Sequence, residues 1–150
     1  MHEDTPYSAT KTSIADIDEN DVIRRINELD VSDGWKAKFR IIAEAGGPKL
    51  PYLKDLPLSK RLEVRSNILA ALFGPFYYIA KGMWKKGLVI GFGSQLAFFF
   101  IFLILDHYGL IRPAYFSYPH LSLAAAAGAF ATFANVDYYK KMVLDENGWL

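Results

Sequence analysis

The chain has 150 residues, of which 52% are hydrophobic and 15% aromatic, and it carries no cysteine and a formal net charge of +1. A near-neutral charge argues against a general nucleic-acid binder, because such proteins carry a large basic excess. The lack of cysteine excludes disulfides and thiolate metal sites. The high apolar content excludes a fully disordered chain.

The distribution of charge divides the chain into two parts. Residues 1–60 contain 11 acidic and 9 basic residues, whereas residues 67–139 contain six charged residues in 73 positions. In a soluble protein each helix keeps a charged face, so a charge-poor half is typical of a membrane protein. The division predicts a flexible tail at 1–19, a cytoplasmic helical segment and linker at 20–58, a membrane domain at 59–143 and a C-terminal tail at 144–150.

Two helices are expected in the front segment. Apolar residues between Val22 and Leu29 recur on one face, and the acidic residues before them favour a helix start. A second helix follows Ser32, a suitable N-cap, and ends before Gly46-Gly47-Pro48. Its apolar stripe either packs on the first helix, lies on the membrane or forms a partner surface. The candidate partner surface consists of Trp35, Phe39 and Ile42.

Two apolar runs in the second half predict an antiparallel pair of membrane spans. Residues 87–105 are 19 residues without charge, and as a helix they extend roughly 28 Å, close to a hydrocarbon core of about 30 Å. A second run, rich in alanine, predicts a span over 120–137. Residues 106–120 then form the external turn between the spans.

A shorter apolar run at 67–80 is interrupted at Gly74-Pro75, where proline removes an N–H and disfavours helix before it. Basic residues lie at both of its ends, so the positive-inside rule places both ends, and both chain termini, in the cytoplasm. We therefore expect a re-entrant or interfacial helix at 67–80. The alternative is three full spans with the front segment outside. In either case the fold class is all-α, and the chain is a multi-pass protein.

Aromatic and basic residues around this break predict a membrane-interface block, because tyrosine and tryptophan favour the headgroup level and lysines meet anionic lipids. The block consists of Gly74, Pro75, Tyr77, Tyr78, Lys81, Trp84, Lys85 and Lys86. Small and polar residues within the spans predict helix packing, within one molecule or between copies of a homo-oligomer. These are Gly87, Gly91, Gln95, Ala124, Gly128 and Thr132.

Motifs for catalysis or cofactor binding do not occur in the sequence: it has no Walker loop, HExxH, GxSxG or dinucleotide fingerprint. Asp106, His107 and His120 in the external turn are weak candidates for a metal site, and Asp106 with His107 for an acid–base pair acting on lipid. We expect no catalytic residue, no cofactor, no metal and no nucleic acid.

The block from Asn67 to Tyr78, continued by Lys81-Gly82-Met83-Trp84-Lys85-Lys86-Gly87-Leu88, resembles the small bacterial inner-membrane proteins grouped as domain of unknown function 2628. The upstream stretch with Trp35, Phe39 and Ala43 to Pro48 is similar to what precedes that block in longer members. The resemblance covers residues 30–145. It implies a bacterial integral membrane protein with a cytoplasmic front segment, and it brings no established activity.

These observations predict a non-enzymatic protein of the bacterial inner membrane that contacts lipids and anchors or recruits a protein partner at the cytoplasmic face. One alternative is a small transport or pore component formed by oligomerisation. Another is an immunity-type protein that protects against a membrane-acting toxin.

Overall fold

The computed structural model describes residues 19–111 and 118–149, and these form helices and connecting turns without a strand. The all-α class is therefore confirmed, whereas the predicted flexible tail lies outside the described residues except for Glu19. The elements are α1 (Glu19–Glu28), α2 (Asp33–Glu44), the 3-10 turn η2 (Leu53–Asp55), α3 (Leu58–Arg65), α4 (Ile68–Phe73), α5 (Pro75–Ala80), α6 (Trp84–His107) and α7 (Tyr118–Val143).

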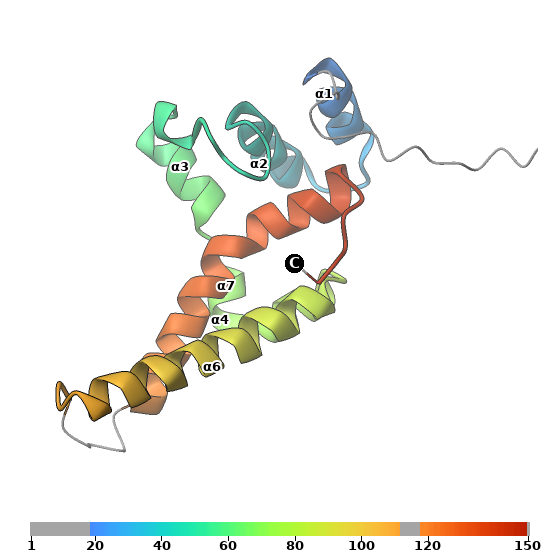
Figure 1. Cartoon of the computed structure of the whole chain (residues 1–150). Helices are drawn as coiled ribbons and strands as arrows, with labels where there is room; N and C mark the ends of the chain where they lie inside the picture. Colours follow the sequence, from blue (N-terminus) through green and yellow to red (C-terminus); the bar gives the residue numbers. More distant parts are fainter. Residues whose placement is uncertain (1–18, 112–117, 150) are drawn as a thin grey trace, which may run out of the picture.

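The two longest helices, α6 and α7, run side by side in opposite directions (Figure 1). Lys86 at the start of α6 pairs with Asp137 late in α7, whereas Gln95 further along α6 donates to the carbonyl of Ser122 early in α7. The start of α6 therefore lies beside the end of α7, and the two helices are antiparallel. We call this antiparallel pair, together with α4 and α5, the stem.

Helix α6 is long and apolar enough to cross a membrane, and none of its 18-residue apolar window is buried. The core helix of a soluble protein is mostly buried by its neighbours. The exposed apolar window of α6 differs from such a helix in this respect. Among the described residues it is the one helix with this length and composition. The alanine-rich α7 is less apolar, and the predicted second span is therefore not confirmed by the same criterion.

The break predicted at Gly74-Pro75 is confirmed. Gly74 has φ +46° and ψ −119°, a backbone conformation that favours glycine because it has no Cβ. Pro75 then occupies the first turn of α5. Backbone N–H groups in a first turn make no hydrogen bond within the helix, so the N–H that proline lacks is not needed there. We call α4 and α5 with this bend the hairpin.

The two ends of the hairpin lie at the same level of α7. At its start, Asn67 donates to the side chain of Asn135 over 2.8 Å. Just after its end, the Lys81 ammonium lies 4.4 Å from the Tyr138 ring. Its bend lies deeper, since a Cβ on the bend glycine would be 3.3 Å from Phe130, which precedes the other two α7 residues by more than one helical turn.

Above the stem lies a second unit that we call the cap, formed by α1, α2, η2, α3 and residues 138–143 of α7 (Figure 1). Phe39 and Ile42 are fully buried in its core, and the Phe39 ring lies 5.7 Å from that of Tyr139. Trp35 is partly buried, 4.7 Å from the Tyr138 ring. The candidate partner surface is therefore wrong for Phe39 and Ile42, because both are buried in the cap core, where Phe39 packs against Tyr139 of α7.

The segment between α2 and α3, predicted as a linker, is ordered and packs on the cap core. Helix α2 ends in two hydrogen bonds of 2.9 Å, from the Gly47 N–H to the Ile42 carbonyl and from the Gly46 N–H to the Ala43 carbonyl, a Schellman arrangement. After it, η2 turns the chain back, and Leu53 and Leu56 are buried in the cap core.

The C-terminal residues fold back onto the loop before α6. The Asn147 side chain donates to the Gly82 carbonyl over 3.1 Å, and the Trp149 ring lies 5.6 Å from that of Trp84. The predicted C-terminal tail is thus tied to the start of the stem.

Candidate functional site

A buried ion pair joins the two long helices at the end of the stem nearest the cap. The Lys86 ammonium lies 3.2 Å from Asp137 Oδ1, and Lys86 is only 3% exposed. The Tyr78 hydroxyl donates to Asp137 Oδ2 over 2.9 Å from the hairpin. Buried charges persist when they are paired and hydrogen-bonded. We call Tyr78, Lys86 and Asp137 the ion-pair cluster.

The sequence carried a signal for this pair. Lys86 directly precedes the uncharged run 87–105, and Asp137 is the last residue of the predicted second span, 120–137. An antiparallel arrangement brings these two positions together with opposite charges. The prediction that Lys86 faces anionic headgroups is wrong, because its ammonium points inward to the carboxylate.

A second group of buried polar side chains meets α7 at Asn135, two residues before Asp137. It consists of Asn67, Tyr77 and Asn135, and we call it the amide cluster. The Asn67 amide donates to Asn135 Oδ1 and, over 3.0 Å, to the Tyr77 hydroxyl, while its own Oδ1 accepts from the Ala70 N–H. The Asn135 amide lies 3.0–3.1 Å from the last carbonyls of α3 and the joint that follows it. These belong to Glu63, Val64 and Ser66.

The amide cluster satisfies backbone groups at two helix ends. The last carbonyls of a helix and the first N–H groups of the next have no partner within their own helix. Asn135 supplies donors for the end of α3, and Asn67 caps the start of α4. The cluster thus joins the cap and the hairpin to α7. Among the described side chains, no buried nitrogen or oxygen lacks a hydrogen bond.

A cavity of about 220 Å³ adjoins the ion-pair cluster. Its walls are otherwise apolar and come from Val89, Ile90 and Phe133 of the stem and from Trp149. The charges there already satisfy one another, so the arrangement favours holding helices together over proton or group transfer.

The predicted interface block is divided by the structure. Tyr77 and Tyr78 are buried and hydrogen-bonded inside the protein, so their side chains do not face headgroups. Their level near the membrane interface stays a prediction. Trp84 is exposed, as an interfacial tryptophan would be, and Lys85 lies 5.9 Å from the Trp149 ring. Lys81 lies 4.8 Å from the Trp35 ring.

Partial burial, aided by the nearby charge of Lys141, lowers the pKa of Lys81. Both effects disfavour its charged form. A second cation, Lys38, lies 5.2 Å from the same Trp35 ring. Two ammonium groups therefore flank one indole ring where the cap meets the stem.

The packing residues predicted on α6 make contacts within the chain. A Cβ on Gly87 would lie 2.8 Å from the Tyr78 Cβ, so this glycine allows α5 to approach closely. Gly91 faces Phe130 of α7, at 3.7 Å from such a Cβ. The Gln95 side chain donates a hydrogen bond of 3.3 Å to the Ser122 carbonyl and so joins α6 to α7.

The packing residues predicted on α7 do not face α6. Ala124 and Gly128 are exposed, and a Cβ on Gly128 would meet nothing within 4 Å. The Thr132 hydroxyl bonds back to the Gly128 carbonyl. Intramolecular packing along this stripe is therefore wrong, because the contact face of α7 lies elsewhere. It consists of Ala126, Phe130 and Ala134.

The weak metal candidates are not brought together. Across residues 19–111 and 118–149 no group of three or more histidine and acidic side chains could hold a metal ion. The His107 ring packs 5.3 Å from that of Tyr108. Residues 112–117 of the predicted external turn, which include Arg112 and Tyr115, lie outside the described residues.

Two curated relatives match the chain, both named "Uncharacterized protein YigF", one from Salmonella typhimurium and one from Salmonella typhi. Each is 28% identical over 99 residues, covering 60% of this chain and 79% of the relative. No protein-family model matches the chain, and no solved structure matches it significantly. The resemblance to domain of unknown function 2628 stays a prediction.

Proposed function

We propose that the chain is an integral protein of the bacterial cytoplasmic membrane, with α6 and the first part of α7 crossing the bilayer. The observation that carries this proposal is the apolar window of α6, of which nothing is buried. In water such a surface would form a large exposed apolar patch, which soluble monomers rarely have. Lipid is the solvent in which that helix is stable.

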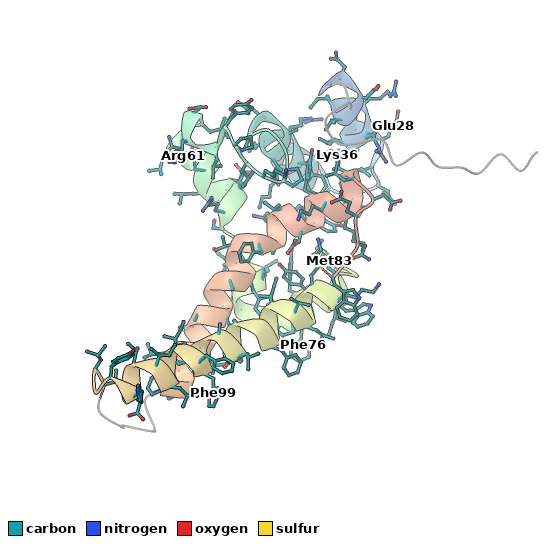
Figure 2. The ribbon with its side chains drawn as sticks, in the orientation of Figure 1. Glu28, Lys36, Arg61, Phe76, Met83 and Phe99 are labelled. Carbon is teal, nitrogen blue, oxygen red and sulfur yellow. The ribbon has the colours of Figure 1, made fainter. Side chains whose placement is uncertain are left out.

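The apolar surface continues from α6 onto the hairpin and α7. Phe99 on α6 and Phe76 on the hairpin project outward (Figure 2). Leu121, Leu123 and Phe133 are exposed on α7. The polar clusters instead lie inside, between the helices. Apolar residues outside and satisfied polar groups inside are what a bilayer requires of a protein, and this supports a second span despite the many alanines of α7.

The path of the hairpin supports the re-entrant alternative. Its two ends lie level with each other on α7, and its bend lies deeper in the stem. A segment that spans the bilayer would have its ends on opposite sides. The basic residues at these ends, among them Arg65 and Lys85, therefore lie on the cap side. The positive-inside rule then places the cap in the cytoplasm.

We infer that the cap anchors a protein partner on the cytoplasmic side. Leu58 and Leu62 are both exposed and lie four residues apart on α3, so they share one face. Leu58 begins the helix at the end farthest from its joint with the hairpin. This pair is a better candidate contact than the buried stripe of α2. Charged residues such as Glu28 and Lys36 surround the cap (Figure 2).

The topology is testable by labelling because the chain contains no cysteine. Single-cysteine variants at Asp55, Arg65, Lys85 and Leu110 are treated in intact spheroplasts with a membrane-impermeant maleimide. We expect labelling at Leu110→Cys alone, and labelling of the others only after permeabilisation. Labelling of Arg65→Cys but not Lys85→Cys would indicate three spans. Extraction of the protein by alkaline carbonate would overturn membrane insertion.

The partner is testable by photo-crosslinking in the cells that express the chain. A photoreactive amino acid replaces Leu62, and a matched one replaces exposed Glu28. We expect a discrete crosslinked protein at position 62 that Leu58→Asp abolishes without changing the labelling pattern. Equal crosslinking at both positions, or none at position 62, would overturn the anchoring role and leave the topology standing.

A further inference from the structure

A cleft of about 500 Å³ opens where the cap meets the hairpin. Three helix ends form its walls: the start of α2, the end of α3 and the start of α4. The side chains that matter to the argument are Trp35, Lys38, Glu63, Ser66, Ile68 and Leu69. Its volume lies within the range of roughly 300–1,000 Å³ typical of small-molecule sites.

One part of the cleft carries a cation and an anion on different walls. Lys38 comes from α2 and Glu63 from α3, and neither forms an ion pair with the other or with another described residue. Partial burial lowers the pKa of Lys38, and the charge of Glu63 opposes that effect. The Lys38 ammonium is therefore partly desolvated and has no bonded anion, which favours an anionic ligand.

Another part of the cleft lining is apolar and exposed. Ile68 is 74% and Leu69 57% exposed, and Leu72 and Phe73 continue the same surface along α4. In the proposed membrane placement this surface faces the acyl chains. The cleft thus leads from a zwitterionic pair of side chains directly onto lipid-facing helix.

We propose that this cleft binds the headgroup of a glycerophospholipid that carries phosphoethanolamine. The phosphate lies on the Lys38 ammonium, the amine of the headgroup lies on the Glu63 carboxylate, and the acyl chains run along Ile68 and Leu69. The inference rests on the proposed membrane placement and goes beyond it by naming a lipid class.

The pair of opposite charges selects among headgroups. A glycerol headgroup offers Glu63 no cation and leaves its carboxylate facing a net negative lipid. A choline headgroup is cationic but has no N–H to donate to the carboxylate. Free inorganic phosphate can contact Lys38 but cannot use the apolar half of the cleft.

The test measures lipid retention by native mass spectrometry on the full chain, purified from mixed micelles containing equal amounts of phosphatidylethanolamine, phosphatidylcholine and phosphatidylglycerol. We expect one phosphatidylethanolamine to be retained over the other two, by about tenfold if one charged contact discriminates. Lys38→Gln should reduce retention of phosphatidylethanolamine and phosphatidylcholine alike. Glu63→Gln should remove the preference between them and leave phosphatidylcholine retention unchanged.

Exposed Lys49→Gln and Glu28→Gln serve as matched controls and should behave as the unmodified chain. Equal retention in all variants, or a preference for phosphatidylglycerol, would overturn the proposal. Displacement of the lipid by millimolar inorganic phosphate would also overturn it, since the site would then recognise phosphate alone. If Leu110→Cys labels as expected while lipid selectivity is absent, this inference alone fails. If that labelling fails, the membrane placement fails first.

Discussion

Removing the carboxylate of Asp137 leaves the buried ammonium of Lys86 without an ion-pair partner. In the native structure this carboxylate is the ion-pair partner of Lys86 and the acceptor for the Tyr78 hydroxyl. The Asp137→Ala variant leaves the Lys86 ammonium, 3% exposed, without an anion between α6 and α7. It also leaves the buried Tyr78 hydroxyl without its acceptor. We therefore expect the contact between the two long helices to weaken at the cap end.

The expected loss is large because of burial. Breaking a buried ion pair by deleting one partner costs about 3–5 kcal/mol, mostly through the orphaned charge. The chain contains a matched exposed pair, Lys60 with Glu44, at 2.7 Å and with side chains 39% and 49% exposed. Deleting a partner from such a pair costs about 0–1 kcal/mol. If the distance between the charges alone set the loss, the exposed pair, which is the shorter of the two, would cost more to break than the buried pair.

The assay is reversible unfolding of the full chain in mild detergent by added dodecyl sulfate, followed by far-ultraviolet circular dichroism. Asp137→Ala should lower the free energy of unfolding several times more than Glu44→Ala. The double variant Lys86→Leu/Asp137→Leu should recover much of that loss, because two apolar residues leave no buried charge.

Two outcomes would refute this reasoning. Equal losses for Asp137→Ala and Glu44→Ala would show that the ion pair does not hold α6 to α7. A double variant as unstable as Asp137→Ala would show that the loss does not arise from the orphaned ammonium of Lys86.

Two other substitutions test the contacts of the hairpin. Gly87→Ala should destabilise the chain by about 1–3 kcal/mol in the same unfolding assay, because the new Cβ would lie 2.8 Å from that of Tyr78. Gly93→Ala is the control: its Cβ would meet nothing within 4 Å, so this substitution should be neutral or stabilising. Asn135→Leu should cost about 1–3 kcal/mol for each carbonyl left unsatisfied at the end of α3. Its specific readout is faster tryptic cleavage at Arg65 in the folded protein, and an unchanged cleavage rate would contradict the capping role.

Local sequence signals determined much of the helical framework. Ser32 occupies the N-cap position of α2, although its side chain makes no capping hydrogen bond, and the pair Gly46-Gly47 ends the helix as glycine C-caps do. The bend at Gly74-Pro75 follows from the backbone preferences of those two residues. The uncharged run 87–105 lies within α6, which extends it by a few residues at each end. These signals depend on residues that are close together in the chain, so they can be recognised in a single sequence.

The end of α7 was decided by tertiary packing. Tyr138, Tyr139 and the lysines that follow are typical of residues leaving a bilayer, which favours a span ending at 137. In the structure the helix continues to Val143, because Phe39 and other cap residues bury its last turns. The same contact converts the apolar stripe of α2 from a candidate surface into core.

Which way a polar side chain points was likewise decided only in three dimensions. The sequence by itself determined that Tyr78 and Lys86 lie at the edge of an apolar segment, where an interfacial position is the ordinary expectation. The tertiary structure turned them inward, because Asp137 lies opposite, 51 positions from Lys86 along the chain. A buried charge is tolerable only with such a partner, and the partner is known only once the helices have packed.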